Sequence, residues 1–412
     1  MDAQLEKSNK ANYDHYEHTD SCRFLRWTAK ECYQYMYSRP WQKVNDFYSE
    51  MVQGRVSLSN LFKKEALATC EDSEYKEDHA DVVQSKDRSG RWARVTFKIL
   101  LSYHGSSFDG WQKQPGLNTV QGIVERSLGK FVDEKKSQLL KEKNLPLEGC
   151  AVVAGRTDKG VTAFQQVCSF YTWREDVKPQ EIEEAINNAA LGKMKVISVA
   201  KVSREFHPNF SAKWRRYLYI FPFNDGEGEH GSHVEKDSNE YRKVCADWIH
   251  NNYTCVKDNG HNDDNEEMDA GNKPTMFEVS KVDRLLRQLE GKLLSYKMFA
   301  RDTKASRNTG PPTECFVFHA RAMVSALPFA QDGTSTRVMC IELVANRFLR
   351  KMVRVLVATA VREAAAGAED DALLKLMDSS CRRATAPPSP PDGLSLVDVG
   401  YTDFVQKNCF IS

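Results

Sequence analysis

Segments with the periodicity of strands and of helices alternate between residues 93 and 224, and this order constrains the fold more than any other feature of the chain. Apolar residues recur at every second position in the expected strands and at every third or fourth position in the expected helices. The expected strands are residues 93–103, 150–154, 167–173, 194–202 and 214–223, and the expected helices are residues 119–132 and 179–190. No nucleotide-binding fingerprint interrupts them. The alternation predicts an α+β fold with helices on one face of a largely antiparallel sheet.

A similar arrangement recurs in the last third of the chain. We expect a helix, two strands, a long helix and a final strand at residues 277–294, 315–327, 337–345, 347–366 and 393–399. In the long helix Arg347, Arg350, Lys351 and Arg354 are spaced to share one face. That basic face fits either plain solvent exposure or phosphate binding.

Charge separates these two parts of the chain. The segment from residue 225 to residue 270 contains 13 acidic and 4 basic residues, so the rest of the chain carries about +10 although the net charge is +1. We therefore expect an N-terminal extension and polar linker at 1–92, a first half at 93–224, a flexible acidic insert at 225–275 and a second half at 276–412. A basic body suggests a polyanionic partner.

The N-terminal extension is unusually aromatic between residues 26 and 52. Aromatic side chains at helical spacing usually pack in a core, although exposed ones also stack on nucleic-acid bases. We expect this stretch to pack as an ordered extension, and we expect residues 71–88, which are polar and charged, to form a linker.

A tight turn between two expected strands carries Asp158 at its tip. Gly155 and Gly160 bracket it, and glycine is needed where backbone adopts positive φ or approaches a ligand closely. There are two interpretations of this segment. It either presents to a substrate the Asp158 carboxylate, which Arg156 keeps ionised, or it is a surface turn with an internal salt bridge. It is not a triphosphate-binding loop, because Val161 stands where that loop needs lysine.

Composition excludes other classes of protein. The chain lacks the roughly 18 to 20 consecutive apolar residues that a membrane span needs. Its eleven cysteines are scattered without a Cys-x-x-Cys pair, which favours reduced thiols and an intracellular protein, in the cytoplasm or nucleus before an organelle. The beginning of the chain resembles neither a secretory signal nor a transit peptide. His230 and His233 are assigned to a polar loop, so no metal site is expected.

Several motifs occur in the order known from one enzyme family. They are Tyr103-His104-Gly105-Ser106, Gly110-Trp111-Gln112-Lys113-Gln114, Thr119-Val120-Gln121, the turn around Asp158, Gln166-Val167, Phe206-His207, Phe210-Ser211-Ala212, Arg215-Arg216-Tyr217-Leu218-Tyr219, the segment from Asn346 to Arg354, and Gly393-Leu394-Ser395-Leu396-Val397. Over about residues 93–401 the chain resembles the TruA family of tRNA pseudouridine synthases. The resemblance does not cover the first 92 residues or the acidic insert.

The resemblance implies a fold, a reaction and roles for particular residues. The fold would be two ferredoxin-like halves with antiparallel sheets joined across a central RNA-binding cleft, usually in a homodimer. The reaction would isomerise uridine to pseudouridine in tRNA, in the anticodon arm, without a cofactor. Asp158 would be the nucleophile, Arg156 would pair with it and help to open the RNA stem, and Tyr217 would stack on the target uracil. Among the basic residues, Arg350, Lys351 and Arg354 would bind the substrate.

The chain departs from the family pattern at a few positions. Lys159 and Thr162 stand where alanine and histidine are common, and Pro208 and Asn209 follow His207 where an alanine and an arginine are usual. The last change affects a phosphate contact rather than the chemistry. A noncatalytic RNA-binding protein or RNA chaperone on the same fold is the alternative, and the joint presence of Asp158, Arg156 and Tyr217 favours the enzyme.

Overall fold

The computed structural model describes residues 18, 20–62, 94–144, 149–224, 273–301, 312–328 and 335–412. The expected linker at 71–88, the acidic segment at 225–270 and both histidines assigned to it lie outside these residues. Within the described part of the chain, no helix combines the length and the apolar character needed to cross a membrane.

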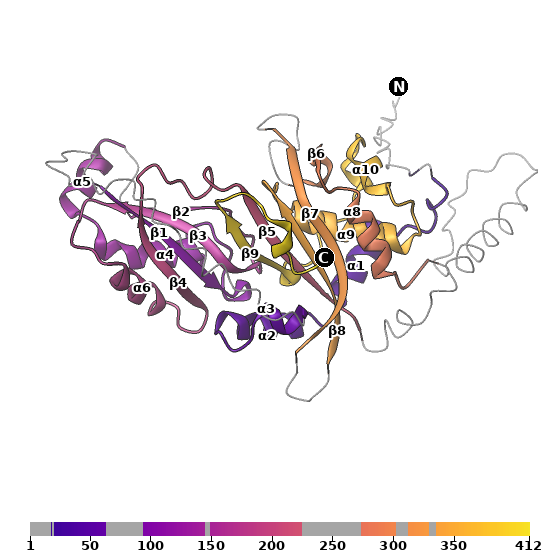
Figure 1. Cartoon of the computed structure of the whole chain (residues 1–412), viewed down its shortest axis with the longest axis horizontal. Helices are drawn as coiled ribbons and strands as arrows, with labels where there is room; N and C mark the ends of the chain where they lie inside the picture. Colours follow the sequence, from indigo (N-terminus) through magenta and orange to yellow (C-terminus); the bar gives the residue numbers. More distant parts are fainter. Residues whose placement is uncertain are drawn as a thin grey trace, which may run out of the picture.

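Helices and strands alternate as the sequence predicts (Figure 1). The first half contains β1 (Val95–Tyr103), α4 (Val120–Leu128), α5 (Glu134–Glu142), β2 (Val152–Val153), β3 (Thr162–Thr172), α6 (Pro179–Asn187) and β4 (Met194–Val202). The second contains β5 (Trp214–Pro222), α8 (Val279–Arg287), β6 (Lys292–Ser295), β7 (Glu314–Leu327), β8 (Thr336–Ala345), α9 (Met352–Ala365), α10 (Ala372–Met377) and β9 (Leu394–Gly400). The extension contributes α1 (Ala29–Tyr37), α2 (Trp41–Val52) and α3 (Leu58–Phe62).

All nine strands of the described residues belong to one sheet, whose order is β4-β1-β3-β9-β5-β8-β7-β6, with β2 paired to β3. Neighbouring strands are antiparallel except for β3 and β9, which run parallel where Thr162 is opposite Ser395. The last strand of the chain therefore lies in the middle of the sheet, between strands of the first and second halves (Figure 1). The predicted mixed α+β fold with a mostly antiparallel sheet is confirmed.

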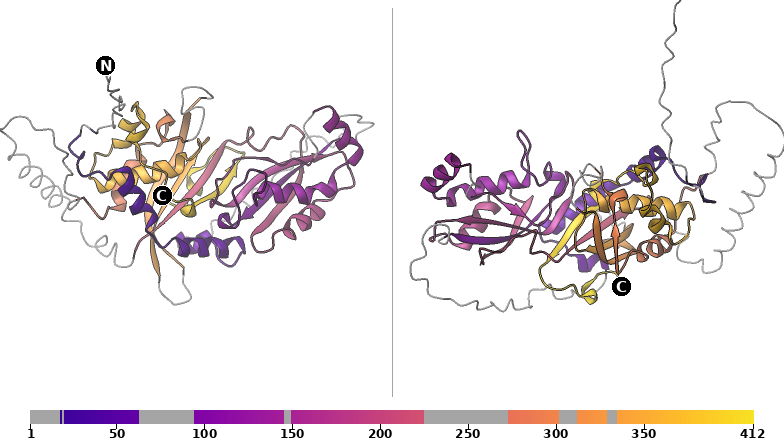
Figure 2. Two further views of the ribbon diagram at one scale, coloured as in Figure 1. Left: turned by 180° about the vertical axis from the view of Figure 1, so that it is seen from behind. Right: turned by 90° about the horizontal axis from the view of Figure 1, so that it is seen from above.

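Amphipathic helices bury their apolar stripes against this sheet. Thr119 accepts a hydrogen bond from the backbone N–H of Gly122 and caps α4, as expected. The buried residues Val120, Ile123 and Val124 then pack in one core with the apolar residues of β1. The extension packs as predicted: α1 joins the core around α9, and α2 covers the other core formed with β5 and β8 (Figure 2).

Three predicted elements are corrected by the structure. The expected buried strand at 150–154 is reduced to β2, where Val152 is 41% exposed at the edge of the sheet. The helix expected at 277–294 ends at Arg287, because Gly291 adopts a φ of +67° and the chain turns back as β6.

The long helix at 347–366 begins five residues later than predicted. Lys351 adopts the left-handed conformation with a φ of 59°, which an α-helix does not continue, so α9 starts at Met352. All fourteen residues of α9 are buried. The predicted basic helix face is therefore wrong, since Arg347, Arg350 and Lys351 precede the helix and only Arg354 belongs to it.

Candidate active site

The turn that carries Asp158 joins β2 to β3 and leaves the Asp158 side chain 29% exposed. The backbone N–H of Val161 donates to the carbonyl oxygen of Asp158 at 3.2 Å and closes the turn. Gly160 has a φ of +84°, and a Cβ there would stand 3.0 Å from the ring of Pro391. Glycine is thus required at this position both for the backbone conformation and for the close approach of the loop before β9.

A buried hydrogen-bond network holds the turn from beneath. The Tyr103 hydroxyl lies 2.7 Å from Oγ1 of Thr157, the residue before Asp158. The amide of Gln166 donates to the carbonyl oxygen of Gly155 at 2.7 Å and to the Tyr103 hydroxyl at 3.3 Å. These bonds link β1 and β3 to both sides of the turn, so the position of the carboxylate depends on the sheet.

The loop after β1 approaches the same turn at van der Waals distance. The backbone N–H of Gly105 donates to Oγ1 of Thr162 at 3.0 Å, and that of Trp111 donates to the carbonyl oxygen of Thr157 at 3.1 Å. A Cβ on Gly105 would come within 2.3 Å of the backbone carbon of Val161. The motifs that precede the Asp158 turn in the sequence are thus its packing partners.

Two arginines from the second half face the Asp158 carboxylate. Nη1 of Arg354 lies 3.4 Å from Oδ2, and Nε of Arg350 lies 4.0 Å from Oδ1. The Arg354 side chain is only 9% exposed, and its Nε donates to the carbonyl oxygen of Ser389 at 2.6 Å. It is therefore a fixed cation, whereas Arg350 is 54% exposed and accessible to a ligand.

The predicted ion pair between Arg156 and Asp158 is not among the contacts of the described residues. The Arg156 side chain is exposed at the surface of the turn, and the guanidinium groups of Arg354 and Arg350 take the place beside the carboxylate. The cations that face Asp158 therefore come from the second half of the chain and not from its own turn.

Tyr217 projects from β5 beside the turn. Its hydroxyl is 3.8 Å from the position that a Cβ on Gly155 would occupy. Burial raises the pKa of Tyr217 to about 12, with the Asp158 charge adding to the rise and Arg215 opposing it. The ring meets that of Phe348 edge to face, at 5.0 Å between centroids and 83° between planes. The phenol is therefore protonated at neutral pH and its ring has a fixed aromatic neighbour.

Arg215 also shapes this site, although sequence reasoning gave it no role beyond its motif. It is 7% exposed, and burial lowers its pKa. Its guanidinium donates to the carbonyl oxygens of Ala154 at 3.2 Å, Asn209 at 2.9 Å and Asn346 at 2.7 Å. It thereby ties the strand before the Asp158 turn to the segment before Arg350. The sequence did contain a signal for this role, namely the two consecutive arginines Arg215 and Arg216 inside an otherwise apolar strand.

Of the predicted site residues, the structure brings together Asp158, Tyr217, Arg350 and Arg354. Lys351 lies next to them in the chain, at the N-cap of α9, and is partly buried. The assembled groups are a carboxylate with two neighbouring cations and a protonated phenol.

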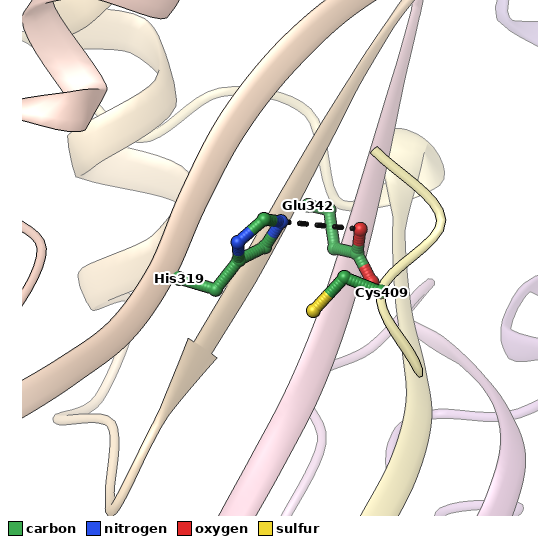
Figure 3. Close-up of side chains that lie close together, drawn as sticks. All are labelled: His319, Glu342 and Cys409. Carbon is green, nitrogen blue, oxygen red and sulfur yellow. Dashed lines mark ion pairs between the residues drawn. The ribbon is translucent and has the colours of Figure 1, made fainter. Parts of the chain in front are cut away.

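One group of metal-ligand types lies apart from this site, on β7, β8 and the C-terminal segment (Figure 3). His319, Glu342 and Cys409 are buried, and their ligand atoms lie within 4.8 Å of one another. However, Nε of Arg216 lies 3.6 Å from Oε1 of Glu342, and the backbone N–H groups of Phe410 and Ile411 each donate to Oε2 at 2.9 Å. A carboxylate that already faces a cation and two donors is a poor ligand for a divalent ion. We interpret the group as a buried polar network that holds the C-terminal segment.

Replacing Glu342 should therefore destabilise the fold. In Glu342→Ala the Arg216 charge and two backbone N–H groups lose their acceptor, and we expect the free energy of unfolding to fall by about 3–5 kcal/mol. Glu342→Gln keeps an oxygen for the N–H groups and should cost less. Urea denaturation of both variants, with the exposed Glu205→Ala as control, measures the difference. A loss below about 1 kcal/mol in Glu342→Ala would contradict this interpretation.

Comparisons with known proteins give one matching family model and several relatives. A family model described as tRNA pseudouridine synthase matches residues 300–402. The tRNA pseudouridine synthase A of Leptospira biflexa is 27% identical over 307 residues, which cover 74% of this chain and 94% of the relative. The protein of that name from Lacticaseibacillus casei is 27% identical over 309 residues, 74% of this chain and 99% of its own length.

The enzyme of that name from Borrelia hermsii is 34% identical over 174 residues, which cover 39% of this chain and 65% of the relative. A crystal structure of an unknown protein from Galdieria sulphuraria also matches, at 13% identity over 66% of this chain and 94% of that one, but its TM-score of 0.16 supports no argument. The family model and the relatives thus agree in showing similarity to tRNA pseudouridine synthases. Over about three quarters of its length, the chain is similar to the TruA family of these enzymes.

Proposed function

We propose that this protein is an isomerase that converts uridine to pseudouridine in tRNA, with Asp158 as the nucleophile. The observation that carries the proposal is the convergence of Arg354 and Arg350 on the Asp158 carboxylate, beside a protonated Tyr217 phenol. The relatives that match most of this chain are named tRNA pseudouridine synthase A.

The proposed reaction breaks the bond between C1′ and N1 of the uridine and forms a bond between C1′ and C5. The C5 proton is released to solvent, and N1 takes up a proton in its place. A carboxylate serves as the covalent or proton-abstracting group in such a sequence. The Tyr217 ring would stack on the uracil once the base has left its helix, and stacking returns roughly 1–3 kcal/mol of the cost of unstacking.

We further propose that the fold consists of two ferredoxin-like halves joined in one sheet. One half is formed by β1 to β4, and the other by β5 together with residues 276–412, so β5 leaves the first half, whose expected bounds were 93–224. In support, the first half contains the four strands β1 to β4 and the helices α4 and α6. Its antiparallel sheet has the order β4-β1-β3-β2, which is 4-1-3-2 when the four strands are numbered along the chain. The second half contains the strands β5, β7, β8 and β9 and the helices α8 and α9. Numbered from one to four along the chain, these strands have the order β9-β5-β8-β7, which is again 4-1-3-2. The halves meet at the parallel pairing of β3 with β9, beside the Asp158 turn, and this junction would hold the RNA.

The finer parts of the proposal concern the substrate and the assembly. Arg350 and Lys351 would bind phosphates of the tRNA, and Arg156, which is exposed at the turn, would contact the RNA stem rather than Asp158. We propose a uridine of the anticodon arm as the target and a homodimer as the assembly, both by analogy with the family.

The test is release of tritium from tRNA transcripts labelled at C5 of uracil, with and without a chelator, followed by mapping of pseudouridine in the product. We expect release by the wild-type protein at the same rate in both conditions. Tight tRNA binding without release from any transcript would contradict the enzymatic proposal and favour a noncatalytic RNA-binding protein or chaperone.

A further inference from the structure

The N-terminal extension is built into the neighbourhood of Asp158, although the family motifs begin only after residue 92. Its residue Arg26 donates to the buried Glu363 of α9 at 2.7 Å. The Tyr48 hydroxyl of α2 donates to the carbonyl oxygen of Gly393 at 2.7 Å, just after the proline that contacts Gly160. These bonds anchor α1 and α2 on both elements that approach the Asp158 turn from the second half.

One residue of α1 lies in the neighbourhood of the active-site cation. Burial raises the pKa of Tyr37, and the charge of the nearby Arg354 guanidinium opposes that rise. Arg354 itself donates to the carbonyl oxygen of Ser389 and to the Asp158 carboxylate. Its side chain therefore lies between Asp158 and the Tyr37 end of α1.

The ring of Tyr37 continues outward into a second aromatic ring. Tyr33 lies one helical turn earlier on α1 and stacks on Tyr37, at 4.0 Å between centroids and 19° between planes. Four aromatic residues of the extension, Trp27, Phe47, Tyr48 and Phe62, are buried, but Tyr33 is 50% exposed. A continuous series therefore runs from the Asp158 carboxylate through Arg354 and Tyr37 to an exposed, flat aromatic face.

We propose that Tyr33 and Tyr37 form a stacking platform for a nucleobase of the RNA substrate near the target uridine, and that Tyr37 also positions Arg354. This inference depends on the proposed function for the nature of its ligand. Aromatic rings accept any base, because every base has a π-face, and the adjacent cations suit the phosphates that accompany it. The extension would thereby add a contact to the substrate that the shared motifs do not provide.

The two tyrosines have separable roles, and two substitutions distinguish them. Tyr33→Ala removes the outer ring, and we expect the Kd for an unmodified tRNA transcript to rise roughly 5- to 100-fold with kcat nearly unchanged. Tyr37→Phe keeps the ring but removes the hydroxyl near Arg354, and we expect kcat to fall roughly 3- to 10-fold with Kd unchanged.

Filter binding at several salt concentrations adds a readout that a purely structural role would not reproduce. The slope of log Kd against log salt should be unchanged in Tyr33→Ala, because stacking releases no counterions, whereas it should decrease in Arg350→Ala. Leu139→Ala, on the distant α5 and 53% exposed, is the matched surface control. Thermal melts check that each variant is folded.

The outcomes also separate this inference from the proposed function. If Tyr33→Ala binds tRNA as tightly as Leu139→Ala, the platform is refuted even when the wild-type protein releases tritium. If the wild-type protein releases no tritium but its tRNA binding still depends on Tyr33, the platform stands and the enzymatic proposal fails. Absence of tRNA binding by the wild-type protein would refute the platform as well.

Discussion

Asp158→Asn is expected to lower the rate of tritium release from C5-labelled tRNA by at least about 10⁴-fold, the scale seen when a nucleophile is removed. The substitution replaces a carboxylate oxygen by an amide of similar size, so the turn can keep its hydrogen bonds to Thr157 and Val161. It removes the negative charge that faces Arg354 and Arg350. The loss should therefore appear in kcat at saturating tRNA, because the phosphate contacts are intact.

Lys159→Ala is the matched control for this substitution. Lys159 is the next residue of the turn, its side chain is 77% exposed, and it pairs with Asp109 at the surface. Exposed ion pairs contribute about 0–1 kcal/mol, so activity should stay within a few fold of wild type. Equal losses in the two variants would mean that the turn is only structural, and retained activity in Asp158→Asn would refute the assigned nucleophile.

Gly105→Ala should be the most damaging single change outside the Asp158 turn. The added Cβ would stand 2.3 Å from the backbone carbon of Val161 and 2.4 Å from the carbonyl oxygen of Gly160. Backbone atoms cannot rotate away as a flexible side chain can, so either β1 or the Asp158 turn has to shift. A displacement of about 1 Å at a reacting group costs about 100-fold in rate, and overpacking costs about 1–3 kcal/mol of stability.

Gly129→Ala tests the same chemical change where space is available. Apart from its chain neighbours and the backbone of its own helix, no described residue has an atom within 4 Å of a Cβ built at Gly129, and its backbone is right-handed helical. This variant should be as active as wild type and no less stable. Single-turnover rates and melting temperatures of the two variants give the comparison. Normal activity in Gly105→Ala would show that the loop after β1 does not position Asp158.

The sequence was sufficient to predict the elements whose pattern is local. Helix α4 follows from an N-cap and an apolar stripe, both of which lie within ten residues, and β4 extends over the predicted residues 194–202. The start of α9 was missed because Lys351 adopts a left-handed conformation that its neighbours in the sequence do not require. Tertiary contacts, including the bond between the backbone of Arg301 and the carbonyl of Arg350, accompany that break.

The cation that pairs with Asp158 could not be predicted from the local sequence. Sequence order made Arg156 the natural partner of Asp158, since it is only two residues away. The observed cation, Arg354, is 196 residues further along the chain. Nothing local in the sequence indicates this pairing, because it arises from the crossing of α9 and the Asp158 turn at the junction of the two halves. The exposure of the Tyr33 side chain could not be predicted from the sequence either, because it depends on how α1 packs.

The central place of β9 has a consequence for synthesis of the protein. A ribosome delivers this strand after every other strand of the sheet has been made. Until then the inner edges of β3 and β5 have no partner on this side, and unpaired strand edges are prone to aggregation. The candidate active-site turn borders β3, so a nascent chain would acquire its complete site geometry only after β9 has been made. A product terminated before β9 should therefore be inactive and dependent on chaperones.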